Sequence, residues 1–416
     1  MKEVLAILVG GGPAPGINGV VSAATIEAIE HGKEVIGIIG GINSLYAGDR
    51  SAAMKLTLEN VANIESSGGS ILLTSRGMPE NPEKAFHTLM STLRALKVRY
   101  LITIGGEGTA YVAKEIERAS KGLISVIHVP KTIDNDLPLP GGLPTFGFET
   151  ARHWGVKITK NLKEDARTTR RWYFIKTMGR YTGHLALGIG KAAGASVTLI
   201  PEEFPAKKTS FKKVADILEG AIIKRLSIGK DYGTAILAEG ISGKLNPEEL
   251  EGHDGVLPRD EAGRISLARI DLSRFLREMV TKSLSERGIE LKIADKDVGY
   301  ELRAAPPVPF DAEYTRNLGY GAIKYLVHLG GSGAMVIFYE GKLRSIPFVD
   351  MMDEETGLIK VRYVDPSSET YMVARDYMFR LEKEDFEDAK ALQKLAKTAR
   401  MSVEEFRKRF EGTVKD

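Results

Sequence analysis

Short apolar runs alternate with amphipathic stretches over the first 145 residues of the chain. Four mainly apolar runs end in Gly or Pro, as buried parallel strands do: residues 4–11, 34–41, 99–106 and 123–130. Between them, residues 17–32 and 109–122 keep their apolar positions near a 3.6-residue period and end in Gly. This alternation predicts a doubly wound α/β sheet with right-handed crossovers, in which ligands bind at the carboxyl ends of the strands.

A second alternation begins near residue 150. Strands are predicted at residues 171–179, 195–203 and 233–240, and helices around residues 184–193, 209–227 and 264–286. A helix around 311–328 leads to a hairpin at 333–348, with its turn at Glu340-Gly341. From residue 382 the chain is charged and helical, which is typical of a solvated helical pair. The pattern predicts two doubly wound, Rossmann-like domains with mainly parallel sheets and a helical C-terminal tail.

Composition limits the kinds of partner. The chain has 416 residues, of which 43% are hydrophobic, and its net charge of +3 does not favour nucleic acid or an anionic membrane. Cysteine is absent, which excludes disulfides, thiolate nucleophiles and Cys-ligated zinc. The apolar run at the start is too short for a signal peptide, and no run reaches membrane-spanning length. We therefore expect a soluble, cytoplasmic protein.

The first glycine loop, residues 8–18, joins a strand to a helix. Bare backbone NH groups at a helix N-terminus bind phosphate, and glycines let the phosphate approach. A dinucleotide site is disfavoured because Pro15 stands at the third glycine position and Gly40-Gly41 stands where a ribose-binding acid is needed. No P-loop motif occurs. The loop is either a phosphate site or a tight turn without a ligand.

A second loop, Thr-Ile-Gly-Gly-Glu-Gly-Thr, follows the strand at 99–106. Gly105 and Gly106 form the turn, and Thr109 is expected to cap the next helix. Glu107 either stabilises that helix N-terminus or reaches a Mg²⁺ ion that bridges phosphates.

The third loop, residues 130–142, reads PKTIDNDLPLPGG and carries two carboxylates. In an extended segment Asp134 and Asp136 would point the same way, with Asn135 opposed. Three prolines stiffen the loop, as a catalytic acid or base requires. A divalent metal, or Lys131 nearby, would relieve the repulsion between the two carboxylates. The alternative is an Asx-turn loop that hydrogen-bonds to itself.

Five motifs together resemble the 6-phosphofructokinases: GGGPAPGIN, GGSILLTSRG, GGEGT, PKTIDND and MGRYTGHLAL. The resemblance covers about residues 1–380 and is nearest to the longer branch, which mixes pyrophosphate-dependent and ATP-dependent enzymes. It implies Mg²⁺-dependent phosphorylation of fructose 6-phosphate at its 1-hydroxyl, giving fructose 1,6-bisphosphate in glycolysis, with the active site in a cleft between the two domains. The implied domains are a donor domain (1–145 and about 303–360), a fructose 6-phosphate domain (146–302 and about 361–381) and a C-terminal extension (382–416).

The resemblance also implies roles on the donor side. Asp134 would be the base that takes the proton from the sugar hydroxyl, and Asp136 with Glu107 would hold Mg²⁺. Glu107 stands where the family usually has Asp. Thr132 and the backbone at Gly12 would contact the transferred phosphoryl group. The remaining implied donor-binding residues are Arg76, Gly106, Gly108, Thr109 and Lys131.

On the sugar side, the implied ligands besides Thr132 and Asp134 are Met178, Gly179, Arg180, Glu239, Tyr300 and Arg303. Arg180 is also implied in catalysis, Glu239 in bonding sugar hydroxyls, and Tyr300 with Arg303 in binding the 6-phosphate. Arg171 matches an arginine that reaches the site from a neighbouring subunit, which implies a homodimer or homotetramer. Ala294 stands where a second such arginine is expected, and Lys292 or Lys296 could replace it. His184 is expected to begin a helix rather than to act as a base.

Two features of the sequence disagree about the phosphate donor. In the family, Gly at position 108 is typical of ATP enzymes, and Lys at position 131 is typical of pyrophosphate enzymes. A fixed acid at 108 would block a nucleotide, whereas Lys131 is long and can swing, so the sequence favours ATP with pyrophosphate as the alternative. Weaker alternatives are a lipid or NAD kinase with a GGDGT-like loop, or a non-catalytic phosphate-binding regulatory subunit.

Overall fold

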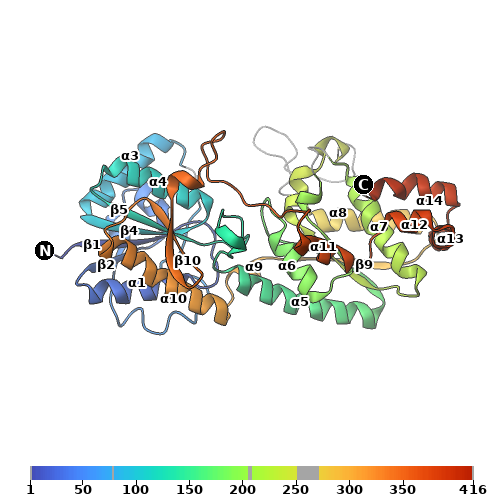
Figure 1. Ribbon diagram of the computed structural model, residues 1–416, viewed down its shortest axis with the longest axis horizontal. Helices are drawn as coiled ribbons and strands as arrows, with labels where there is room; N and C mark the ends of the chain where they lie inside the picture. Colours follow the sequence, from blue (N-terminus) through green and yellow to red (C-terminus); the bar gives the residue numbers. More distant parts are fainter. Residues whose placement is uncertain (1, 77–78, 205–208, 251–270, 415–416) are drawn as a thin grey trace. The chain divides into compact units, whose positions relative to one another are not determined.

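The computed structural model describes residues 2–76, 79–204, 209–250 and 271–414, and the chain divides into two compact units (Figure 1). The first unit comprises residues 1–153 and 300–362, and the second comprises residues 154–299 and 363–416. The boundary between the units, after His153, falls inside a helix, α5 (Phe148–Thr169).

The first unit contains a seven-stranded sheet in the order β11-β10-β5-β4-β1-β2-β3. Its strands are β1 (Val4–Val9), β2 (Glu34–Ile38), β3 (Ala53–Leu56), β4 (Val98–Gly105), β5 (Ser125–Pro130), β10 (Ala334–Tyr339) and β11 (Lys342–Pro347). The five inner strands are parallel, while β3 and β11 run antiparallel at the two edges. The predicted hairpin is confirmed, since Glu340 and Gly341 both have positive φ angles, as a two-residue turn between β10 and β11 requires.

Helices cover both faces of this sheet (Figure 1). On one face α1 (Ile17–Glu30) packs along α10 (Pro309–Ile323), which continues as a π-helix over Lys324–His328. On the other face lie α2 (Gly41–Tyr46), α3 (Pro82–Ala95) and α4 (Glu107–Ser120). A Cβ at Gly319 would stand 2.8 Å from the Ala23 side chain and the Val20 carbonyl, so this glycine lets α10 approach α1 closely.

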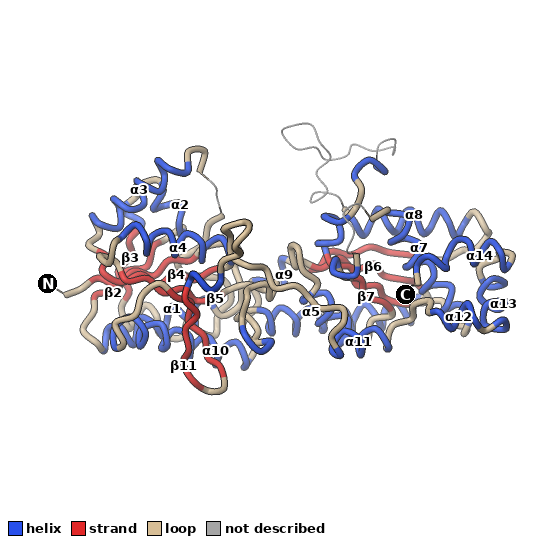
Figure 2. Tube along the Cα trace, turned by 45° about the horizontal axis from the view of Figure 1, so that its top comes forward, coloured by secondary structure: helices blue, strands red, loops and turns tan. Residues whose placement is uncertain are grey.

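The second unit contains a four-stranded parallel sheet in the order β7-β8-β6-β9. Its strands are β6 (Arg171–Thr177), β7 (Val197–Leu199), β8 (Gly233–Ala238) and β9 (Lys292–Val298). The helices α7 (Phe211–Ser227) and α8 (Leu272–Ser285) pack on one face, and α11 (Glu369–Asp376) lies on the other (Figure 2). The helix α6 (His184–Ala193) contacts β7 and β8 and packs beside α11. The first part of the predicted helix 264–286 lies outside the described residues, and the pattern missed the charged edge strand β9.

The C-terminal residues belong to the second unit. They form three helices, α12 (Lys383–Glu387), α13 (Ala389–Thr398) and α14 (Val403–Phe410), so the predicted helical pair is wrong in number. It is also wrong in character, because Phe386, Phe406 and Phe410 are buried together against α7. Arg409 of α14 and Arg287 both bind Glu219, a buried carboxylate of α7. None of the helices described is both long enough and apolar enough to traverse a bilayer.

Candidate active site

The loop after β1 is bonded to the segment at residues 74–75. The Gly11 amide donates to the Ser75 carbonyl (3.0 Å), and the Thr74 hydroxyl donates to the Gly11 carbonyl (2.5 Å). The loop ends at Gly16, whose φ of 97° places it in the left-handed region before α1. No side chain caps α1, so its first amides present the positive end of the helix to the loop, as in anion-binding sites.

Three cationic side chains converge on Gly12 in the first unit. The Lys131 ammonium donates to the Gly12 carbonyl at 2.5 Å. A guanidinium nitrogen of Arg76 lies 2.8 Å, and one of Arg303 lies 3.2 Å, from the point where a Cβ on Gly12 would stand. A side chain at position 12 would displace these guanidinium groups, and the charge that they bring favours a phosphate group.

Lys131 is buried, whereas the sequence predicted a side chain that is free to move. It is 4% exposed, and its backbone amide donates to the Gly105 carbonyl at 2.8 Å. The expectation of a long cation free to swing is wrong, because the side chain is buried with its ammonium at the glycine loop. The positive charge of Lys131 therefore has a defined place beside Gly12.

The helix after β4, α4, begins without the side-chain cap that the sequence predicted. Glu107 is the first residue of α4, Gly106 is the N-cap residue, and no side chain caps the helix. The predicted cap by Thr109 is wrong, because Thr109 lies within the first turn and fills the space beside Gly105 and Gly10. A Cβ at Gly108 would meet no atom within 4 Å, so this exposed position has room for a side chain.

The carboxylate loop is not extended. Asn135 has a φ of 58°, in the left-handed region that Asn tolerates better than most residues, so the premise that Asp134 and Asp136 alternate as in a strand is wrong. The Asp134 amide donates to the Thr132 hydroxyl (3.0 Å), and the Thr145 amide donates to the Asn135 side-chain oxygen (3.0 Å). These two bonds order the loop, and the first is a turn closed by a Thr hydroxyl rather than the Asx turn that the sequence offered as an alternative.

Arg362 holds this loop from a distant part of the chain, and sequence reasoning missed it. Its amide donates to the Asp136 carbonyl (2.8 Å), and its guanidinium donates to the carbonyls of Asn135 (2.9 Å) and Leu143 (2.9 Å). Burial lowers the pKa of Arg362, and the negative charge of Asp136 opposes that shift. The two carboxylates, both nearly buried, thus lie on a loop that a single guanidinium cross-links.

In the second unit, the turn after β6 is organised by Glu239, which follows β8. One carboxylate oxygen of Glu239 accepts from the amides of Gly179 (3.1 Å) and Arg180 (2.7 Å). Both residues have positive φ angles, 152° and 50°, and a Cβ at Gly179 would lie 2.7 Å from the Thr182 carbonyl. Glu239 therefore fixes the backbone of the turn, and the Arg180 side chain extends from it into solvent beside Tyr181.

The remaining predicted residues lie in both units. Met178 packs against Gly299, and its amide donates to the Val298 carbonyl (3.3 Å) in the second unit. Tyr300 and Arg303 form the short helix α9 (Tyr300–Arg303) in the first unit, where the Arg303 guanidinium lies 4.5 Å from the centroid of the exposed Tyr300 ring.

Arg171 and its neighbours occupy the start of the second sheet. The Arg171 side chain donates to the Thr169 hydroxyl at 2.8 Å and remains partly exposed. Ala294 and Lys292 lie on β9, where Lys292 is paired with Arg171. His184 is the first residue of α6, as predicted.

Of the residues predicted to bind the donor, the structure places Gly12, Arg76 and Lys131 together in the first unit, with Arg303 beside them, while the turn at 178–180 and Glu239 lie together in the second. Glu107 at the start of α4 and Asp136 in the buried loop offer carboxylate oxygens, the ligand type that Mg²⁺ prefers. Two carboxylates with substrate phosphates completing the shell are a usual Mg²⁺ donor set, so these residues fit the ion chemically.

The chain is similar to known proteins along almost its whole length. A family model described as Phosphofructokinase matches residues 4–340. The chain is 51% identical to a pyrophosphate–fructose 6-phosphate 1-phosphotransferase of Thermotoga maritima (99% of this chain, 98% of that protein). It is 45% identical to a protein of the same name from Naegleria fowleri (99% and 95%) and 29% identical to an ATP-dependent 6-phosphofructokinase of Streptomyces coelicolor (87% and 98%).

Among solved structures, a pyrophosphate-dependent phosphofructokinase of Marinobacter aquaeolei matches with a TM-score of 0.68 at 17% identity, over 90% of each chain. At that identity the match speaks for the fold alone.

Proposed function

Because the chain belongs to the phosphofructokinase family, we propose that it transfers a phosphoryl group to the 1-hydroxyl of fructose 6-phosphate, with pyrophosphate as the donor. The observation that carries the donor is the buried Lys131 ammonium at the Gly12 carbonyl. The two relatives at 51% and 45% identity, both named as pyrophosphate enzymes, support it. Pyrophosphate, which the sequence offered as the alternative donor, therefore replaces ATP in this proposal.

Position 108 permits either donor, whereas position 131 favours one of them. Gly108 leaves open space, which allows a nucleotide but does not require one. Lys131 places a positive charge in a buried setting beside the glycine loop, where its ammonium donates to the Gly12 carbonyl. A compact, highly charged donor such as pyrophosphate gains more from a buried cation than a nucleotide does, because most of its surface is phosphate oxygen.

In this proposal the chain's own residues divide the work. Asp134 accepts the proton of the sugar hydroxyl, on a loop ordered by Thr132, Thr145 and Arg362. Arg76 and Lys131, with the backbone at Gly12, bind the donor phosphates. Mg²⁺, held by Glu107 and Asp136, supplies neutralisation of the phosphate charge when it is bound.

The acceptor residues are proposed on the same basis. The turn at Gly179 and Arg180, fixed by Glu239, binds fructose 6-phosphate together with Met178, and Tyr300 and Arg303 bind its phosphate. The structure gives Glu239 a contact to the backbone of this turn, so we propose that its first task is to position the turn, with its second oxygen left for a sugar hydroxyl.

The direct test measures fructose 1,6-bisphosphate formation by the purified full chain with Mg²⁺ and, in parallel, pyrophosphate, ATP or ADP. We expect kcat/KM with pyrophosphate to exceed that with ATP by at least about tenfold, which corresponds to about 1.4 kcal/mol of transition-state discrimination. Equal or better turnover with ATP overturns the donor but leaves the acceptor chemistry in place. Binding of fructose 6-phosphate with no turnover by any donor favours the non-catalytic subunit, and phosphorylation of a lipid or NAD instead favours the other kinase classes.

A further inference from the structure

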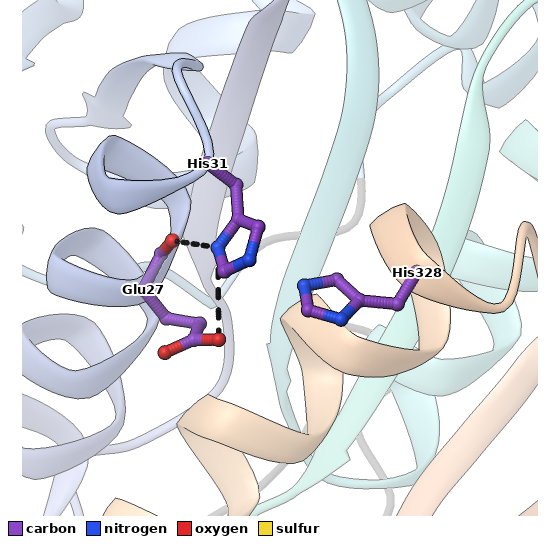
Figure 3. A group of neighbouring side chains, drawn as sticks. All are labelled: Glu27, His31 and His328. Atoms are coloured by element: carbon purple, nitrogen blue, oxygen red, sulfur yellow. Dashed lines mark hydrogen bonds and ion pairs between the residues drawn. The ribbon is translucent and has the colours of Figure 1, made fainter.

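A second cluster of metal-binding side chains lies on the first unit, apart from the carboxylate loop. Among the described residues, Glu27, His31 and His328 bring ligand atoms within 4.8 Å of one another (Figure 3). Glu27 and His31 are one turn apart at the end of α1, and His328 ends the π-helix that continues α10. α1 runs for 14 residues from the glycine loop, so the cluster is about 20 Å of helix away from it.

We propose that Glu27, His31 and His328 bind one late first-row divalent cation of the Zn²⁺ type. Two imidazoles and one carboxylate are the ligand set of open zinc sites, in which water or another small ligand takes the fourth position. Imidazole nitrogen favours Zn²⁺, Ni²⁺ or Cu²⁺ over Mg²⁺ or Ca²⁺, which prefer oxygen ligands. This inference does not depend on the proposed function.

The hydrogen bonding of His31 prepares it as a ligand. Its Nδ1 lies 2.8 Å from the Glu27 backbone carbonyl, which can only accept, and 3.6 Å from Oε1 of the Glu27 carboxylate, so Nδ1 carries the proton and Nε2 is left with its lone pair. In Figure 3 the ring nitrogen not engaged by Glu27 lies on the side of the ring that faces His328. Metal-binding histidines usually donate their second nitrogen to a carbonyl or carboxylate in this way.

The two imidazoles already lie close together. Their ring centroids are 4.2 Å apart and the rings are tilted by 54°, so they do not stack face to face. Tetrahedral zinc with ligand bonds of about 2.0–2.1 Å needs ligand atoms about 3.3 Å apart. Metal binding through Nε2 of His31 therefore requires the Glu27 side chain to rotate away from Nδ1 and the ligand atoms to close in from separations of up to 4.8 Å.

The supports of the cluster are rigid. Buried residues of both helices, including Ala24, Ala28, Ile323 and Leu326, pack in the same core, and the close approach at Gly319 fixes the helix spacing. His31 is the C-cap residue of α1, and His328 lies at the C-terminal end of the π-helix. The negative ends of two helix dipoles therefore flank the site and favour a cation. π-helical turns of this kind are frequent at functional sites.

The test titrates Zn²⁺ alone into the full chain after chelator treatment and desalting, with no substrate present, by isothermal titration calorimetry. We expect one Zn²⁺ per chain with a dissociation constant of about 10 µM or tighter, unaffected by excess Mg²⁺. Co²⁺ bound in place of Zn²⁺ should give the visible absorption of a four-coordinate nitrogen and oxygen site.

Variants assign the ligands. His328→Ala, His31→Ala and Glu27→Gln should each weaken Zn²⁺ binding by at least about 10–100-fold, since even the loss of a group that supports a ligand costs that much. His87→Ala, which removes an exposed histidine from α3, is the matched control and should bind as the unaltered chain does. Circular dichroism without metal checks that each variant is folded, which is expected because the ligands lie at the surface. Binding retained in the two histidine variants, lost equally in His87→Ala, or weaker than about 1 mM in the unaltered chain would overturn the site.

Discussion

The proposed choice of pyrophosphate as donor depends on one side chain, Lys131. Its ammonium lies at the Gly12 carbonyl, beside the Arg76 guanidinium, and it is almost wholly buried. A sequence does not show whether a lysine is buried or solvated, so the weight of Lys131 in the choice of donor could not be predicted from the sequence. The glycine at 108, which the sequence does reveal, only removes an obstacle.

We therefore expect Lys131→Met to lower kcat/KM for pyrophosphate by at least about 100-fold, because removal of a buried charge partner of a phosphate costs about 2–5 kcal/mol. ATP should be affected less. Lys121→Met, at an exposed lysine that ends α4, is the control and should change neither donor. An equal loss with both donors would contradict a selective role for Lys131.

His128 predicts an acid sensitivity of the first unit. It is fully buried between the Thr103 hydroxyl (2.8 Å) and the Gly105 carbonyl (2.9 Å), and burial lowers its pKa to about 3. The unfolded chain takes up a proton at this residue below about pH 6.5 and the folded chain does not, so the free energy of unfolding falls as the pH drops from about 6.5 towards 3.

The variant His128→Gln keeps an amide that can donate to Gly105 and accept from Thr103, but it does not titrate. Between pH 6.5 and pH 4.5 the unaltered chain should lose about 2–3 kcal/mol more stability than the variant. Hydrogen exchange of the β4 and β5 amides in urea measures this difference. Parallel pH profiles for the two chains would show that His128 does not contribute.

At the scale of elements, the parallel strands and their following loops could be predicted because their apolar runs and glycines are local signals. β9 could not, since Lys292, Asp295, Lys296 and Asp297 make an edge strand resemble a loop. The left-handed conformation of Asn135 could have been predicted, because Asn is common in that conformation. The contact of Arg362 with Asn135 could not, because the two residues are 227 positions apart in the sequence and no local pattern connects them.

The C-terminal helices are an integral part of the second unit rather than a solvated tail. Phe406 of α14 is buried, with ring centroids 4.8 Å from Phe410 and 6.0 Å from Phe386. Phe406→Ala should lower the free energy of unfolding of this unit by about 3–5 kcal/mol. Val403→Ala, at an exposed position of the same helix, should cost less than about 1 kcal/mol in the same urea titration. Similar losses for the two variants would mean that α14 is not packed as described.

At the scale of the whole molecule, the resemblance predicts that Arg171 acts in a neighbouring subunit's site. Its side chain, at the start of β6, donates to the hydroxyl of Thr169 at the end of α5, lies 4.0 Å from the Asp165 carboxylate and remains partly exposed. Arg171→Ala and Asp134→Asn should each lower turnover by at least about 100-fold when assayed alone.

Mixing these two inactive variants tests the arrangement. If Arg171 is supplied by a partner chain, subunit exchange creates sites that hold both intact residues, and the mixture should regain up to about a quarter of the unaltered activity. Mixing two batches of the same variant is the control. No recovery after confirmed exchange would mean that each chain uses its own Arg171.

Arg362 has a consequence for how the enzyme fails. It is the last residue of the first unit, so the guanidinium that orders the carboxylate loop stands where the chain departs for the second unit. Anything that pulls this departing segment loose, whether warmth, dilute urea or a protease cut nearby, also releases the loop that carries the proton acceptor. Inactivation should consequently run ahead of melting, leaving an intermediate whose seven-stranded sheet is intact and whose chemistry has already stopped.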